Sequence, residues 1–238
     1  MGQIKSFKID EIVDYTCKDI VANHLIETGC YLIDLTKEQS EWYHWKSGII
    51  APCYCNCRGL ISTVVQRKDI VNFLCDSIKR NFPKADCIAG MATAGIPWAS
   101  MVGFSLDLPV IYIRKQAKKH GVSKRIEGKV NDEKNIVLID DLIASGESIL
   151  DATNVVRDET QTEILGIQSI INWGFAKMFE LLGEYQIQTL TSYEQVIMSA
   201  LRHNLINNND VKFMLDFYRN PFEYDWREFY EEKDNFRF

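Results

Sequence analysis

Apolar residues recur along the chain at two spacings, one typical of helices and one typical of strands. In residues 9–28 and 66–82 they return every three or four positions, which predicts two helices, each with one apolar face. Pro83 closes the second segment, because proline cannot continue a helix. Shorter apolar runs predict three strands in the N-terminal part, at 31–35, 42–46 and 50–57.

From residue 87 onward, short apolar runs alternate with helical periodicity. The predicted strands are 87–91, 110–113, 136–139, 164–171 and 186–190. The predicted helices are 95–104, 147–158, 174–183, 192–203 and 209–218. This alternation is typical of βαβ units, so the predicted fold class is α/β, with a mostly parallel sheet flanked by helices.

The order of these elements predicts three parts. Residues 60–185 form the core, residues 1–59 supply a helix and a small hood of strands, and residues 186–238 add a C-terminal strand and helices packed on the core. The length of 238 residues suits one α/β domain with small additions. The 46% content of hydrophobic residues supports a sizeable core.

The charge and the apolar runs limit the possible partners. The net charge of -6 argues against a general nucleic-acid binder, which needs a broad positive potential. No apolar run reaches the ~18–20 residues of a membrane helix. The first residues lack the apolar region of a signal peptide. We therefore expect a cytoplasmic protein with no nucleic-acid and no membrane partner.

The chain has seven cysteines, an odd number scattered along its length, which is typical of a reducing compartment. Cys53, Cys55 and Cys57 alternate along a predicted strand, where all three thiols would face one side. This spacing invites a metal site. Zinc sites usually combine one nearby pair of cysteines with a distant second pair, and none is evident, so we favour reduced, partly buried thiols.

The segment from Ile136 to Ser148 carries the strongest chemical signal. An apolar run typical of a strand covered on both faces precedes Asp140 and Asp141, at the strand end where ligands bind in open α/β sheets. The small polar loop that follows can wrap N–H groups around a phosphate at a helix N-terminus. Its cradling residues would be Ala144, Ser145, Gly146, Glu147 and Ser148. An Asp-Asp turn with an ordinary helix N-cap is the alternative.

The segment 114–129 is strongly basic, with seven Lys or Arg in sixteen residues of an acidic protein. Gly121 and Gly128 make it bendable. Its simplest role is to meet a polyanion such as pyrophosphate. A solvated charged loop is the alternative.

Two of these segments resemble one enzyme family. The run Val-Leu-Ile-Asp-Asp-Leu-Ile-Ala-Ser-Gly-Glu-Ser within 136–148 is similar to the phosphoribosyl-pyrophosphate (PRPP) motif of type I phosphoribosyltransferases. The pattern Arg-Lys-x-x-Lys-x-His-Gly resembles the catalytic loop of orotate phosphoribosyltransferases. The resemblance implies that Arg114, Lys115, Lys118 and His120 engage the pyrophosphate, with Lys118 the strongest catalytic candidate. In the family this loop reaches the neighbouring subunit, which implies a homodimer with shared active sites.

Two further segments extend the resemblance. Residues 45–60, beginning Trp-Lys-Ser-Gly, are similar to the family's base site. The resemblance implies that Lys46 lies beside orotate and the ribose, that Tyr54 and Cys55 pack on the base, and that Arg58 helps to frame it. Residues 89–97 resemble the family's pyrophosphate-binding loop, which implies a binding role for Thr93 and Ala94.

The chain departs from the family pattern at several positions. Ala94 stands where some relatives have a lysine, and Asn56 replaces a more usual aspartate. Glu147 is a bulky anion inside the phosphate loop, and we expect its side chain to point outward because an inward carboxylate would repel phosphate. Residues 171–175 read Ile-Asn-Trp-Gly-Phe and lack the arginine that helps many relatives to hold the orotate carboxylate.

The resemblance implies transfer of the phosphoribosyl group from PRPP to orotate, giving orotidine 5′-monophosphate and pyrophosphate. Asp140 and Asp141 would bind the ribose hydroxyls and hold Mg²⁺ through water. Two alternatives stay open. One is a phosphoribosyltransferase for another base, and the other is a non-catalytic regulator of the same fold that senses PRPP or a nucleotide.

Overall fold

The structure is a computed structural model that describes most of the chain. The described residues are 9–36, 41–45, 48–117, 124–130, 135–160, 162, 164–219 and 221, with side chains described from residue 17 onward. In this part of the chain, none of the helices is both long and apolar enough to cross a membrane.

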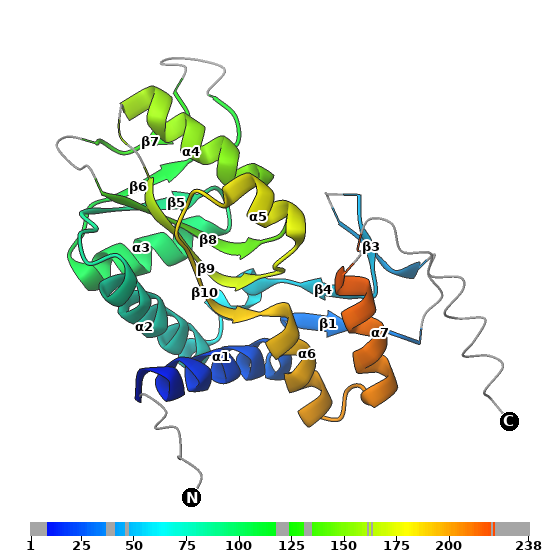
Figure 1. The fold of residues 1–238 in the computed structure, drawn as a ribbon. Coiled ribbons are helices and arrows are strands. Elements are labelled where there is room, and N and C mark those ends of the chain that lie inside the picture. The colour runs from blue at the N-terminus through cyan, green and yellow to red at the C-terminus, as the bar shows by residue number, and fades with distance from the viewer. Residues whose placement is uncertain are drawn as a thin grey trace, which may run out of the picture.

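A six-stranded sheet forms the centre of the molecule (Figure 1). Its strand order is β10 (Ile187–Ser192), β9 (Ile164–Asn172), β8 (Ile136–Ile143), β5 (Cys87–Met91), β6 (Val110–Ile113) and β7 (Ile126–Glu127). All neighbouring pairs are parallel except β6 and β7, which are antiparallel. The predicted α/β fold with a mostly parallel sheet is therefore confirmed.

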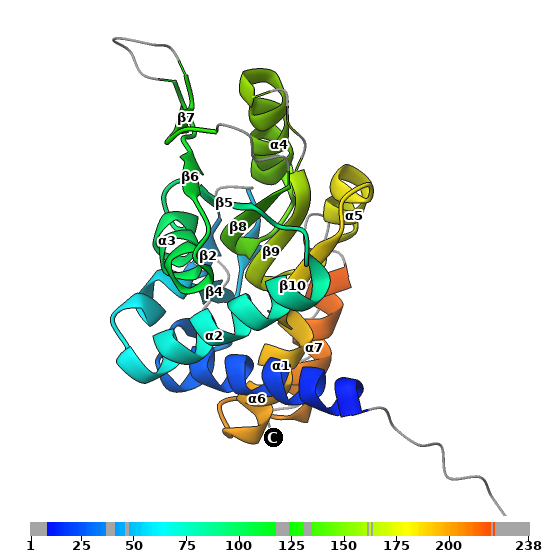
Figure 2. The ribbon, with the colours of Figure 1, turned by 90° about the vertical axis from the view of Figure 1, so that its left-hand side faces the viewer.

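Helices cover both faces of this sheet (Figure 2). On one face lie α2 (Val64–Asn81) and α3 (Gly95–Leu106). On the other lie α4 (Glu147–Thr160) and α5 (Ala176–Leu182). Helices α3, α4 and α5 each lie between two strands of the sheet in chain order, as the βαβ pattern predicts.

The strands contribute side chains to two apolar clusters, one on each face of the sheet. Along β8, Val137 and Ile139 join the cluster under α2 and α3, whereas Ile136 and Leu138 join the cluster under α4 and α5. All four side chains are fully buried. A strand covered on both faces needs apolar residues at every position, which explains the unbroken apolar run.

The N- and C-terminal segments pack together below the sheet. Helix α1 (Ile9–Glu27) contacts α6 (Tyr193–Arg202) and β10, and α7 (Asn208–Arg219) follows α6. Two small antiparallel pairs form the predicted hood: β1 (Tyr31–Ile33) with β4 (Cys53–Cys55), and β2 (Tyr43–His44) with β3 (Ile50–Ala51).

Three predicted boundaries are wrong. The strand expected at 50–57 is two strands, because Pro52 interrupts it, and Cys57 begins a 3-10 helix, η2 (Cys57–Ile61). The strand expected at 136–139 continues to Ile143, since β9 pairs with it along its whole length. Strand β7 was not predicted, and it lies inside the segment expected to be a polar loop.

Candidate active site

The two aspartates lie within β8 and not after it, which corrects the prediction. Asp140 is paired with Ser169 of β9, and the ladder continues through Leu142 opposite Ile171. Both carboxylates are therefore fixed to the regular part of the sheet, near its carboxyl edge. The backbone N–H of Asp141 donates to Oδ1 of Asp140 at 3.0 Å. A pair held in this way has little freedom to turn away from a ligand.

Burial and mutual repulsion control the charge of this pair. Desolvation raises the pKa of Asp140 well above its ordinary value, and the charge of Asp141 raises it further. Burial also raises the pKa of Asp141, while the hydrogen bond with Asp140 and the charge of Arg58 act to lower it. The charge of Lys115 lowers the pKa of Asp140. The charges of two predicted site cations, Arg58 and Lys115, thus act on the two predicted site carboxylates.

Arg58 approaches the aspartates from η2. Its side chain is exposed, and its Nε donates to Oδ1 of Asn56 at 3.1 Å. The amide oxygen of Asn56, at the position where the family pattern has a more usual aspartate, thus accepts a hydrogen bond from Arg58. The replacement noted in the sequence leaves Arg58 with a positioning partner.

The loop between β8 and α4 has the form expected of an anion cradle. Gly146 has a φ of +84°, a conformation that side chains rarely adopt, and its carbonyl accepts the N–H of Leu150 to start α4. Ala144 and Ser145 are half-buried, whereas Ser148 is exposed. N–H groups at such a helix start face solvent and favour an anion.

Glu147 points outward, as predicted. Its side chain is 62% exposed and forms an ion pair with Lys177 of α5. The acidic side chain therefore meets a cation at the surface. The repulsion that it would exert on a phosphate in the loop is reduced by both the exposure and the pairing.

A second loop reaches the same edge of the sheet from β5. Thr93 is exposed, Ala94 is half-buried at the start of α3, and the peptide bond between Ala92 and Thr93 is cis. Gly95 packs so closely on β8 that a Cβ there would lie 2.4 Å from the carbonyl oxygen of Ile139 and 3.3 Å from the Cα of Asp140. The start of α3 is therefore adjacent to the aspartates.

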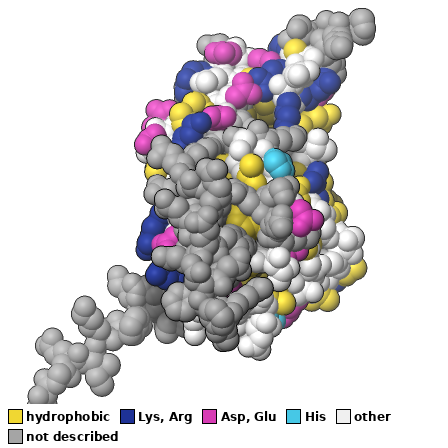
Figure 3. Space-filling view, turned by 90° about the vertical axis from the view of Figure 1, so that its right-hand side faces the viewer, with side chains coloured by type: hydrophobic (Ala, Val, Ile, Leu, Met, Phe, Trp, Pro, Cys, Tyr) yellow, Lys and Arg dark blue, Asp and Glu magenta, His cyan; other side chains and the backbone are white. Residues whose placement is uncertain are grey.

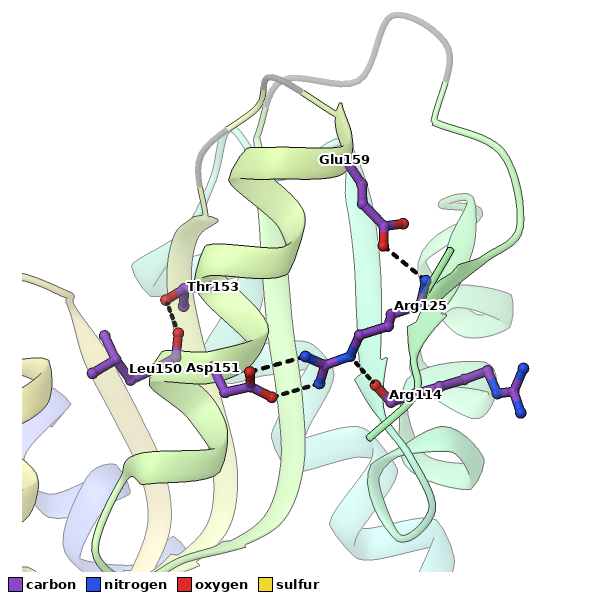
Figure 4. A network of polar contacts seen from close by, with 6 residues as sticks. All are labelled: Arg114, Arg125, Leu150, Asp151, Thr153 and Glu159. Carbon is purple, nitrogen blue, oxygen red and sulfur yellow. Dashed lines mark hydrogen bonds and ion pairs between the residues drawn. The ribbon is translucent and has the colours of Figure 1, made fainter. Parts of the chain in front are cut away.

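The basic segment is anchored to α4 through Arg125 (Figure 4). The guanidinium of Arg125 makes a bidentate ion pair with Asp151, and its Nε donates to the carbonyl oxygen of Arg114 at 2.7 Å. The carboxylate of Glu159 accepts the N–H groups of Arg125 at 2.8 Å and of Ile126 at 3.2 Å. These contacts tie the two ends of the basic loop together and to the helix that starts at the phosphate loop.

Arg114 and Lys115 precede that loop, whereas Lys118 and His120 lie outside the described residues. The Arg114 side chain points away from Asp151 (Figure 4) and pairs with Glu127 of β7 at 3.5 Å. Lys115 is exposed. The structure thus places Arg114 and Lys115 at the end of β6 where the basic segment begins, and the charge of Lys115 reaches Asp140.

The predicted base site is described in part. Lys46 lies outside the described residues, but its neighbour Trp45 is held in the β2–β3 turn, because its N–H donates to Ile49 and its carbonyl accepts from Gly48. Tyr54 is half-buried on β4 and stacks on Tyr43 with ring centroids 5.6 Å apart.

Aromatic packing joins this hood to the core. The ring of Trp45 lies 4.4 Å from the ring of Trp173, which is 2% exposed and also contacts Phe175 and Tyr193. The N–H of Trp173 donates to the carbonyl oxygen of Ile143, at the end of β8. The segment where many relatives carry an arginine therefore belongs to an apolar core in this chain.

The three clustered cysteines do not share one strand, contrary to the prediction. Cys53 is fully buried on β4, and burial raises its pKa to about 12. The Sγ atoms of Cys55 and Cys57 are 3.5 Å apart. The contact with Cys55, together with burial and the charge of Asp141, raises the pKa of Cys57 well above its ordinary value. None of the seven cysteines, all of which are described, forms a disulfide.

The donor set at the aspartates suits a hard cation. Among the described residues, no group of three or more His, Cys, Asp or Glu side chains could hold a metal ion. Mg²⁺ is commonly bound by one or two carboxylates together with water and substrate phosphates. Asp140 and Asp141 therefore fit a Mg²⁺ that arrives with a phosphorylated substrate.

The surface nearest to α7 is mixed in charge (Figure 3). In the described part of this face, Lys and Arg side chains gather toward the top, with Asp and Glu between them. The overall acidity of the chain thus does not exclude local positive charge.

The contacts of Arg125 with Asp151 and Glu159 were not predicted from the sequence, because these residues are too far apart in the chain to form a motif.

Comparison with known proteins gives a consistent result. The sequence-family model of the phosphoribosyl transferase domain matches residues 61–166. The structure resembles an orotate phosphoribosyltransferase from Aeropyrum pernix with a TM-score of 0.66 at 21% identity, covering 79% of this chain and 99% of that one. It also resembles UMP synthase from Leishmania donovani with a TM-score of 0.70 at 22% identity, covering 84% of this chain and 42% of that one. At such identities the likeness concerns the fold.

Sequence relatives extend the result to the family. The chain is 35% identical to the orotate phosphoribosyltransferase of Bacillus subtilis over 211 residues, which cover 88% of this chain and 95% of the relative. It is 38% identical to that of Enterococcus faecalis (strain ATCC 700802 / V583) over 184 residues, covering 76% and 87%. With this agreement over most of both chains, and with the aspartate pair and both loops at one sheet edge, the chain belongs to the orotate phosphoribosyltransferase family.

Proposed function

We propose that the chain transfers the 5-phosphoribosyl group of PRPP to orotate, releasing orotidine 5′-monophosphate and pyrophosphate in pyrimidine biosynthesis. The observation that carries the proposal is the grouping of Asp140 and Asp141 with Arg58, Lys115 and the loop at the start of α4. Membership of the family supports the choice of reaction.

The PRPP site follows from the charges of these groups. The carboxylates of Asp140 and Asp141 accept hydrogen bonds from the ribose hydroxyls and stabilise positive charge that develops at the anomeric carbon. The backbone of residues 144–148 and the hydroxyls of Ser145 and Ser148 bind the 5-phosphate at the N-terminus of α4. Mg²⁺, held by the two aspartates through water, would neutralise charge on the pyrophosphate.

Basic side chains supply the rest of the pyrophosphate site. Thr93 and Ala94 contribute from the loop before α3, and Arg114, Lys115, Lys118 and His120 from the basic loop. The ion pair of Arg114 with Glu127 is long and partly exposed, so its loss costs little when Arg114 turns toward a substrate. Closure of the loop excludes water and completes the set of positive charges.

The base is bound between the hood and the core. Lys46 lies beside orotate and the ribose, Tyr54 packs on the base, and Arg58 frames it. The reaction needs no covalent intermediate on the protein, because positioning and charge stabilisation of the ribosyl centre lower the barrier.

The proposal includes a homodimer with shared active sites in the cytoplasm. The basic loop leaves the sheet between β6 and β7, at the outer edge of the strand order, which would let its residues reach a second copy. The seven cysteines without a disulfide support a reducing compartment.

The test is an assay with a panel of bases. Purified protein is mixed with PRPP and Mg²⁺ and with orotate, uracil, hypoxanthine or adenine, and the consumption of each base is followed. We expect turnover with orotate. Turnover with a purine alone would refute the choice of base, and PRPP binding without turnover of any base would instead identify a regulator.

A further inference from the structure

We propose that Cys55 and Cys57 form a dithiol that is oxidised to an intramolecular disulfide by small disulfides, and that this modification inhibits the enzyme. Their Sγ atoms are already 3.5 Å apart. Cys55 is half-buried, whereas Cys57 is 1% exposed. The Cys55 thiol is therefore partly accessible to solvent, whereas the adjacent Cys57 thiol is buried. This is the arrangement expected of an attacking and a resolving cysteine.

The alternative of a metal site is weaker. Two thiolates alone do not make a structural zinc site, which uses four ligands. In the part of the chain that the structure describes, the neighbouring side chains do not complete such a set. The chemistry that remains for two adjacent thiols is a two-electron oxidation.

The required movement is small and local. Bringing the two sulfur atoms from 3.5 Å to a bond of about 2.05 Å needs an approach of roughly 1.5 Å. Cys55 ends β4 and Cys57 begins η2, so the bond spans the junction of two elements. Asn56 between them is held by its N–H, which donates to the carbonyl oxygen of Cys30 at 2.7 Å. We therefore expect the movement to fall on the side chains and on the start of η2.

The reaction is balanced by the small disulfide itself. The Cys55 thiolate attacks one sulfur of R–S–S–R, the S–S bond breaks, and R–S⁻ leaves and takes up the proton that Cys55 released. Cys57 then loses its proton and attacks the Cys55 sulfur, which releases the second R–S⁻, again as R–SH. The two protein thiols lose two electrons and two protons, and the small disulfide is reduced to two thiols.

Oxidation is expected to act on the aspartates through η2. The negative charge of Asp141 raises the pKa of Cys57. The next residue, Arg58, carries a positive charge that lowers the pKa of the Asp141 carboxyl. A shift at the start of η2 changes both contacts. We expect kcat/KM for PRPP to fall at least about tenfold, as misplacement of charged groups by about 1 Å costs up to 10²-fold. This consequence, unlike the disulfide, rests on the proposed function.

The experiment uses the full chain and glutathione disulfide. The protein is incubated with the disulfide, free thiols are blocked, and peptides are analysed by mass spectrometry, while activity with PRPP and orotate is measured before and after addition of dithiothreitol. We expect loss of two hydrogens within residues 53–58, and loss of activity that dithiothreitol reverses. Cys57→Ala should keep its basal activity and carry a glutathione adduct on Cys55, whereas the control Cys17→Ala should behave as the unchanged protein.

The outcomes are distinct. Absence of the 55–57 disulfide in the unchanged protein, or its formation without loss of activity, would overturn this proposal. A reduced protein that does not use orotate would refute the proposed function, while the mass measurement would still decide whether the dithiol forms.

Discussion

Substitution of Gly95 by alanine tests whether the contact between α3 and β8 positions the aspartates. A Cβ at position 95 would lie 2.4 Å from the carbonyl oxygen of Ile139, whereas contacts of real Cβ atoms begin near 3.0–3.4 Å. Relief of this overlap needs a separation of roughly 0.6–1 Å between the start of α3 and β8, because both atoms belong to rigid elements in a close-packed interior. The next residue on β8 is Asp140, so the displacement falls on the site itself.

Two effects are expected from Gly95→Ala. Overpacking of this kind costs about 1–3 kcal/mol of unfolding free energy. For a chain of this size each kcal/mol lowers Tm by about 2–4 °C. A misplacement of about 1 Å between the pyrophosphate loop and the aspartates should also lower kcat/KM for PRPP by up to ~10²-fold. Thermal unfolding and steady-state kinetics, both well below Tm, measure these two effects separately.

Gly166→Ala is the matched control. A Cβ there would lie 2.0 Å from Cε1 of Phe82, which is 2% exposed, so this substitution also overpacks the core, against a buried ring instead of a backbone carbonyl. Gly166 pairs with Val137, three positions before Asp140 and ~10 Å away along the strand. We expect a comparable loss of Tm with unchanged kcat/KM per folded molecule. Equal activity loss in both variants, or unchanged activity of Gly95→Ala, would refute the assigned role of this contact.

Three further predictions concern the charged groups. Folding raises the pKa of Asp140, so its ionisation destabilises the native state as pH rises from the unfolded pKa through the raised folded pKa. Asp140→Asn should therefore raise Tm at neutral pH and flatten this pH dependence of Tm. The same substitution should abolish turnover. Arg125→Ala should lower stability by only about 0.5–1 kcal/mol yet raise KM for PRPP several-fold. Since the hydrogen-bonded ion pair lowers the pKa of Asp151, the stability difference should disappear in unfolding curves as pH falls through that lowered pKa. Lys118→Ala should reduce kcat more than tenfold, while isothermal titration still detects PRPP binding. The control substitution Lys119→Ala should remain active. Equal kcat values for the two variants would remove Lys118 from the mechanism.

Much of the fold could be predicted because its strands are short, apolar and flanked by clear turn signals. The strand at Cys87–Met91 has the predicted bounds. Elements that depend on distant partners escaped prediction. Strand β7 has two residues, too few to show the alternation of apolar and polar positions that predicts a strand. It forms because Tyr112 and Ile113 pair with it and Glu159 accepts the N–H of its first residue.

The candidate site divides in the same way. The outward direction of Glu147 followed from the charge of a phosphate, and the structure confirms it with an ion pair to Lys177. The extension of β8 through Asp140 could not be read from the chain, since an aspartate pair usually ends a strand and the ladder to β9 overrides that preference.

The proposed phosphate half of the site can be read from one contiguous segment, because backbone N–H groups and neighbouring side chains of that segment would bind the anion. The base half depends on side chains that meet only in the folded chain. Trp173 occupies the segment where many relatives carry an arginine, but at 2% exposure it supports the hood through Trp45 and has no surface left for a substrate carboxylate. We therefore expect the anchor for the orotate carboxylate on the hood side, where Lys46 and Arg58 are the proposed cations. We therefore expect the missing arginine to change which element holds the base without affecting the residues proposed to bind PRPP.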